Sequence, residues 1–211
     1  MTFAQIAGFL LAAALITIAP GPDNLSVLSL GLSRGRRAGI GFGLGCAVGC
    51  FTHTLWATLG VTALIAASET AFTLLKLAGA AYLVWLGIGA LRSPGATLAA
   101  DANVAQANDP MRPYLVRGFV ANAINPKVAL FFLAFLPQFI EPARGNAAMQ
   151  TALLGTLFAA QTVLIFGALG WYAGTFGGWL RGRSAVGRWL DRATGLLFIG
   201  LGIRLALAGK D

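Results

Sequence analysis

Two stretches of this sequence are too long and too apolar to belong to a water-soluble core. Ala38–Ser68 and Ala147–Leu180 contain no Asp, Glu, Lys or Arg, although a helix needs only about 20 residues to cross a bilayer. Hydrophobic residues make up 57% of the 211-residue chain and charged residues 10%, against about 25% charged in a soluble domain. This composition predicts a polytopic membrane protein and excludes a disordered chain; two cysteines also exclude a disulfide-rich scaffold.

Four further apolar runs complete a set of six predicted spans. Membrane strands need only about 9–11 residues, so runs of this length favour helices. The predicted spans lie within Phe3–Leu32, Ala38–Ser68, Phe72–Leu91, Leu115–Phe139, Ala147–Leu180 and Trp189–Leu207. The predicted fold class is therefore all-α, a transmembrane bundle of six helices.

A polar segment divides the chain into two sets of three spans. Residues 93–113, rich in Ala, Asn, Asp and Pro, form a predicted cytoplasmic linker between residues 1–92 and 114–211. The third span at Leu77–Ile88 resembles the sixth at Arg192–Ile203 without a gap. Because a unit of three spans reverses its direction when it repeats, the halves would be inverted repeats, a plan common in secondary transporters. Chance similarity between glycine-rich apolar helices is the alternative.

Basic residues lie between the spans and predict how the chain is oriented. The net charge of +8 would suggest nucleic acid as a partner in a soluble protein, but here the positive-inside rule applies. It places the basic links in the cytoplasm and both termini outside. The link residues are Arg34, Arg36, Arg37, Arg92, Arg112, Arg117, Arg181, Arg183 and Arg188.

The first span of each half is interrupted by proline beside polar residues. The interruptions are Pro20–Asn24 and Asn125–Lys127. Proline removes a backbone donor, and irregular backbone inside a membrane survives only against protein or a water-filled cavity. A helix that restarts at such a break presents N–H groups and a positive dipole end, which suits a substrate carboxylate. A kink that only helps packing is the alternative.

Asp23 and Lys127 are the charged residues at the two breaks. A charge at mid-membrane costs about 2.5–3.5 kcal/mol on insertion scales, so we expect both to face a central cavity, with Asp23 as a proton carrier. If they neutralise each other, zwitterionic substrates fit best. Alternatively, each lies near a membrane surface. His53, the only histidine, is either a proton relay or a packed core residue. The predicted substrate-binding residues are Pro20, Gly21, Pro22, Asp23, Asn24, Asn122, Asn125, Pro126, Lys127 and Gln161, and the proton-coupling candidates are Asp23 and His53.

Motifs typical of enzymes are absent or out of context in the sequence. Gly31–Gly35 fits G-x-S-x-G formally but has no preceding strand. No nucleotide-binding loop or metal-ligand spacing is present, so we predict no catalytic residue, no metal and no cofactor. Gly41, Gly45 and Gly49 follow small-xxx-small spacing, which permits close helix contact and makes a homodimer plausible.

Four stretches together resemble the LysE/RhtB superfamily of amino-acid exporters, most closely its homoserine/threonine resistance branch. They are APGPDN at Ala19–Asn24, KLAGAAYLVWLG at Lys76–Gly87, NPK at Asn125–Lys127 and FLPQF at Phe135–Phe139. The glycine-rich stretch after Arg37 adds to the resemblance, which covers nearly the whole chain.

The resemblance implies a multi-pass protein of the bacterial inner membrane that exports amino acids by proton exchange. Small neutral amino acids, similar to threonine or homoserine, are the expected substrates. Protons and membrane lipid are the other expected partners, and nucleic acid is not one. A non-transporting membrane scaffold or assembly protein is the alternative function.

Overall fold

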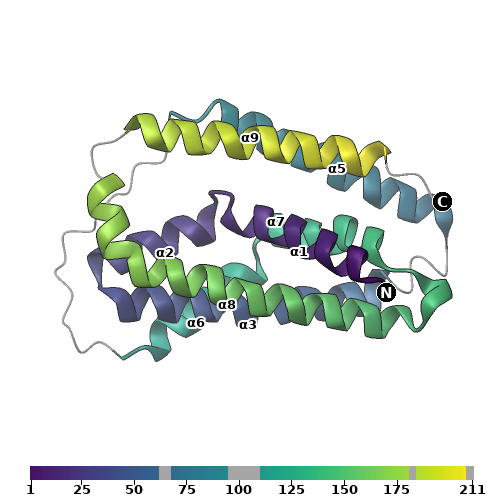
Figure 1. Cartoon of the computed structure of the whole chain (residues 1–211), viewed down its shortest axis with the longest axis horizontal. Coiled ribbons are helices and arrows are strands. Elements are labelled where there is room, and N and C mark those ends of the chain that lie inside the picture. Colours follow the sequence, from purple (N-terminus) through teal and green to yellow (C-terminus); the bar gives the residue numbers. More distant parts are fainter. Residues whose placement is uncertain (62–67, 95–109, 181–183, 208–211) are drawn as a thin grey trace.

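A computed structural model describes residues 1–61, 68–94, 110–180 and 184–207 of the chain, and this part is helical without strands (Figure 1). The predicted all-α class is confirmed. Most of the linker and the residues Arg181 and Arg183 lie outside the described residues. The elements are α1 (Phe3–Ile18), α2 (Pro22–Ser33), α3 (Arg36–Trp56), η1 (Ala57–Val61), α5 (Glu69–Leu91), α6 (Arg112–Ala123), α7 (Pro126–Leu130), η2 (Phe131–Phe135), η3 (Leu136–Phe139), η4 (Pro142–Arg144), α8 (Ala147–Leu180) and α9 (Ser184–Leu207).

The helices form an elongated bundle in which α5 and α9 lie side by side along one flank (Figure 1). Below them in this view, α3 packs against both α6 and α8, and α2 packs against α3 and α8. The π-helical turn η2 joins the two groups, because it contacts α5 on one side and α3 and α7 on the other. The core around η2 is rich in phenylalanine, with Phe131, Phe132 and Phe135 all buried.

Both proline interruptions bend a helix pair sharply. The axis turns by 56° between α1 and α2 and by 49° between α6 and the segment Pro126–Phe139. Pro22 and Pro126 each stand in the first turn of the helix after the break, where a missing N–H costs nothing. The predicted breaks are therefore present, and each leaves backbone carbonyls of the preceding helix without their usual partners.

The described residues contain three helices long and apolar enough to cross a membrane, or five if each bent pair counts as one span. The three are Arg36–Gly60, Thr70–Leu91 and Ala147–Ala173. The predicted sixth span is a helix, α9, but its N-terminal half carries Arg188, Asp191 and Arg192, which keeps it outside this set. The count of six spans, the inverted repeat and the boundaries of the halves stay predictions.

Large apolar side chains cover the outside of the bundle. Trp56, Trp85 and Leu164 are 62%, 65% and 73% exposed, whereas Asp23, Asn122 and other polar side chains are buried. Exposed apolar surface on this scale would be a liability in water. It is what lipid tails accept, so the surface pattern agrees with the membrane assignment.

Glycines of α3 allow α6 to approach closely. A methyl group at Gly45 would overlap the carbonyl of Leu115, and one at Gly118 of α6 would overlap the carbonyl of Phe42. The predicted close helix contact is therefore present, but its partner is a helix of the same chain. The homodimer stays a prediction, and this glycine face is already occupied within the chain.

Gly45→Ala should destabilise the fold, because its new methyl group meets backbone atoms of Leu115 and Phe119 that cannot move independently. Overpacking of this kind costs about 1–3 kcal/mol. The matched control is Gly167→Ala in α8, whose added methyl group meets no atom within 4 Å. The thermal unfolding midpoint of detergent-solubilised protein should fall only for Gly45→Ala, and equal midpoints would contradict the packing described.

Candidate functional site

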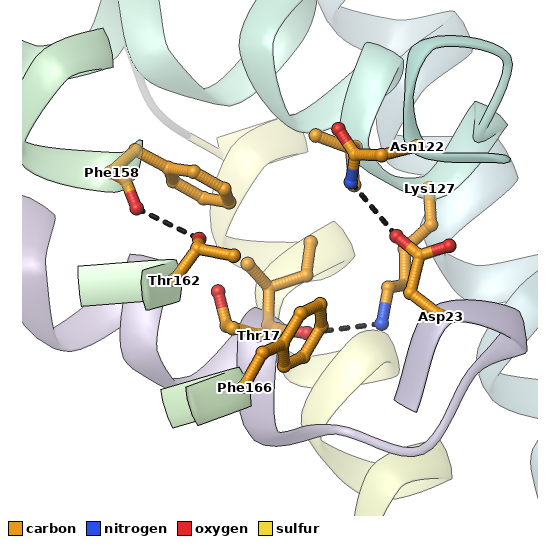
Figure 2. A pocket seen from close by; sticks show the side chains of 9 residues that line it. Thr17, Asp23, Asn122, Lys127, Phe158, Thr162 and Phe166 are labelled. Carbon is orange, nitrogen blue, oxygen red and sulfur yellow. Dashed lines mark hydrogen bonds between the residues drawn. The ribbon is translucent and has the colours of Figure 1, made fainter. Parts of the chain in front are cut away.

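A buried cavity lies where the two broken helices meet. Figure 2 shows side chains from α1 and α2, from α6 and α7, and from α8 converging on one small space. It is lined by Ile16, Thr17, Asp23, Asn122, Lys127, Val128, Phe158, Thr162 and Phe166. The structure thus places three of the predicted site residues, Asp23, Asn122 and Lys127, in the wall of the same cavity.

The cavity is too small in this structure to hold an amino acid. The space that the centre of a water molecule can reach is about 10 Å³, which is room for about one water molecule. An amino acid therefore needs the surrounding helices to move apart before it can enter.

Asp23 is a buried carboxylate with one neutral hydrogen-bond donor. It lies in the first turn of α2 and is 2% exposed. Its Oδ2 accepts a hydrogen bond of 2.8 Å from Nδ2 of Asn122, and its Oδ1 has no partner. Within the part of the chain that the structure describes, Asp23 forms no ion pair. Asp23 therefore makes no direct ion pair, although Lys127 lies in the wall of the same cavity.

Lys127 reaches from α7 to the broken end of α1. Its Nζ donates to the carbonyl oxygens of Ile16 at 3.1 Å and Ala19 at 3.0 Å (Figure 2 shows the lysine directed this way). These carbonyls lie at the C-terminal end of α1, where a cation is also favoured by the helix dipole. The ring of Phe198 in α9 lies 6.0 Å from the same ammonium. Lys127 is 6% exposed and so links three segments of the bundle from inside.

The two remaining asparagines at the breaks satisfy backbone groups. Asn24 donates through Nδ2 to the carbonyl oxygens of Thr17 at 2.7 Å and Ile18 at 3.3 Å. Asn125 caps α7, because its Oδ1 accepts from the backbone N–H of Lys127 at 3.0 Å. Both were predicted to contact substrate, but neither lines the cavity. Their contacts assign them to holding the breaks in shape.

Gly21 and its flanking prolines shape the break rather than line the cavity. A methyl group at Gly21 would come within 2.9 Å of Nζ of Lys127, so the end of the lysine side chain would have to move away from its present position. Pro22 starts α2 and Pro126 starts α7, while Pro20 lies in the turn between α1 and α2.

Comparison with known proteins matches the family model of the LysE type translocator to residues 14–209. The chain belongs to the LysE type translocator family. It is 34% identical over 202 residues to an uncharacterised membrane protein of Vibrio cholerae, covering 95% of each chain. It is 30% identical over 208 residues to the homoserine/homoserine lactone efflux protein of Salmonella typhimurium, covering 99% of this chain and 98% of the relative.

A leucine efflux protein of Enterobacter is 28% identical over 198 residues, covering 94% of this chain and 93% of the relative. No solved structure gives a significant match. The family match, the relatives and the apolar helices together show that this LysE-family chain is a multi-pass protein of the bacterial inner membrane.

In this LysE-family protein, His53 and Gln161 each form a hydrogen bond to a residue of the cavity wall. Nε2 of His53 lies 2.8 Å from the carbonyl oxygen of Asn122, and since a carbonyl only accepts, this nitrogen carries a proton. Gln161 donates through Nε2 to Oγ1 of Thr17 at 3.3 Å. Each therefore contacts a lining residue without lining the cavity itself.

The wall that α8 contributes was not predicted from the sequence. Phe158, Thr162 and Phe166 are spaced by four residues and so share one helix face, and Thr162 donates to the carbonyl of Phe158 at 2.8 Å. Gln161 was the only signal in this helix, and it lies beside the lining face. Thr17 was also missed, although it stands one turn before the predicted break.

Near the N-terminus, side-chain contacts join α1 to the segment that follows η3. Oε2 of Glu141 accepts from Nε2 of Gln5 at 2.9 Å and from Nε of Arg144 at 2.7 Å. Hydrogen bonds from Arg144, and then from Gln5, hold the pKa of Glu141 below its usual value. The carboxylate is therefore charged at neutral pH and keeps these contacts. The contacts are lost as the pH falls through that lowered pKa. Beneath them, Phe9 packs against Phe139 at a ring separation of 5.5 Å.

Gly21→Ala and Lys127→Met should act on the same interaction. The added methyl group displaces the ammonium from the α1 carbonyls, and Met removes that ammonium altogether. We expect each variant to lower the unfolding free energy, and the double variant to lose less than the two losses combined, by about 0.5–3 kcal/mol. Denaturant unfolding of the four proteins in detergent measures this coupling, and additive losses would contradict the contact.

Proposed function

We propose that this LysE-family protein is a secondary active exporter of small neutral amino acids that exchanges each amino acid for protons. The observation that carries the proposal is the cavity at the two helix breaks, where the Asp23 carboxylate forms no direct ion pair and keeps one oxygen without a partner. Two relatives named for efflux of homoserine, homoserine lactone and leucine support the substrate class. Neutral side chains fit because Ile16, Phe158 and Phe166 provide apolar walls.

Asp23 can couple the export of an amino acid to the movement of a proton in the opposite direction. A buried carboxylate can be neutralised by a bound proton or by the ammonium of an amino acid, but it cannot hold both at once. An unneutralised charge is costly inside the membrane, so the protein changes conformation most readily with one of them bound. Export of one amino acid then returns one proton in the opposite direction.

The packing supports an alternating movement of two halves. Elements at the same position in each half pack together, α3 on α8 and α5 on α9, and the helices before the two breaks each pack on the second span of the other half, α1 on α8 and α6 on α3. An inverted repeat of residues 1–92 and 114–211 would produce this pattern. We propose that rocking of these halves widens the small cavity and opens it first to one side and then to the other.

Counterflow in proteoliposomes tests the function. Vesicles loaded with unlabelled homoserine, threonine or leucine should accumulate the same labelled amino acid. Asp23→Asn removes the charge that pairs with the ammonium, a contact worth about 1.5–3 kcal/mol, so its initial rate should fall by about 10- to 100-fold.

The matched control is Asp191→Asn, since Asp191 is also buried but lies in α9 and accepts a hydrogen bond from Ser93 at 2.6 Å, away from the cavity. It should transport like the unmodified protein. Unchanged transport by Asp23→Asn would remove Asp23 from the mechanism. Failure of folded, unmodified protein to accumulate any label would favour the scaffold function instead.

A further inference from the structure

We propose that the cavity recognises the ammonium end of its substrate through Asp23 and does not require the carboxylate end. On this account Lys127 is a positioning residue that holds the α1 break together. The inference rests on the proposed function and narrows it to primary amines, including amino acids whose carboxyl group is blocked.

The first argument is the surplus of hydrogen-bond acceptors at the breaks. Four buried side-chain atoms here have no partner: Oδ1 of Asp23, Asn24 and Asn122, and Nδ2 of Asn125. Three of the four are acceptors. Buried polar atoms without partners are rare in proteins, and Asp23, with its free Oδ1, lies in the cavity wall. The group that this oxygen lacks is a donor.

One hydroxyl in the wall, that of Thr162, adds a further acceptor. Oγ1 of Thr162 gives its proton to the carbonyl of Phe158, so only its lone pairs face other groups. Together with Asp23 it offers acceptors from two helices. An ammonium brings three protons and a positive charge, which suits a carboxylate and a hydroxyl oxygen at one site.

The second argument is that Lys127 is already committed. It spends two of its three protons on the carbonyls of Ile16 and Ala19. The carbonyl of Ile16 has no helical partner because residue 20 is proline, and Ala19 lies at the C-terminal end of α1. A substrate carboxylate could take the ammonium only by leaving these carbonyls bare in a region without water, at a cost of about 1–3 kcal/mol each. Two donor protons of Lys127 are therefore used by the fold, whereas Oδ1 of Asp23 is free to accept from a ligand.

Competition binding distinguishes the two ends of the substrate. Purified protein in detergent binds a labelled amino acid, chosen from homoserine, threonine and leucine, and is challenged with its unlabelled amide or its N-acetyl derivative. The amide keeps the ammonium and lacks the carboxylate; the N-acetyl derivative does the reverse. We expect the amide to compete within about tenfold of the free amino acid and the N-acetyl derivative to be weaker by about 100-fold or more.

Three results would overturn the inference while leaving amino-acid binding intact: N-acetyl competition without amide competition, competition by both, or competition by neither. Failure of every labelled amino acid to bind would instead count against the proposed function. Asp23→Asn should lose the free amino acid and the amide alike, and Asp191→Asn should lose neither.

A Lys127→Met variant separates positioning from contact. If it folds, it should keep the same ratio of amide to free amino-acid affinity, because the lysine does not touch the carboxylate. A selective loss of affinity for the free amino acid would show that Lys127 binds the carboxylate and overturn its assignment as a positioning residue. If the variant does not fold, the analogue pattern of the unmodified protein decides alone.

Discussion

The two hydrogen bonds from Lys127 to the carbonyls of Ile16 and Ala19 determine how the two broken spans fit together. A helix break inside a membrane leaves carbonyls that water cannot reach, and here the missing donor comes from the other half of the chain. The contact brings the start of α7 to the end of α1, which in turn sets Asn122 against Asp23. Gly21 leaves the space that the lysine occupies, and Phe198 extends the contact to α9.

An electrical asymmetry follows from this arrangement. The positive charge is balanced by backbone carbonyls and an aromatic ring, while the negative charge of Asp23 has one amide donor and an unpartnered oxygen. A direct pair would leave the cavity electrically satisfied and would give a proton or an ammonium little reason to bind. On the proposed function, the break in α1 would serve binding indirectly, because its carbonyls hold the lysine ammonium and leave one oxygen of Asp23 without a partner.

The membrane spans could be predicted from the sequence, because a helix that crosses lipid must be apolar over about 20 residues. Ala147–Leu180 was identified from its lack of charge, and α8 has these bounds; the two breaks followed from proline. The rotation of α8 could not be predicted, because a helix that is apolar all round carries no signal for which face meets a cavity. Phe158 and Thr162 were missed for that reason. Asn24 and Asn125 were expected beside the substrate, but the sequence alone could not show that backbone groups use them.

Proton release on substrate binding tests whether the substrate ammonium and a proton compete for Asp23. Homoserine, threonine or leucine is added to purified protein in weakly buffered detergent solution, and the pH change is followed from mildly acidic to mildly alkaline conditions. If ammonium and proton compete for Asp23, binding should release up to about one proton per substrate at the pH where the empty carboxyl is protonated. Asp191→Asn should behave in the same way. Saturable binding that releases no proton at any pH would contradict the account.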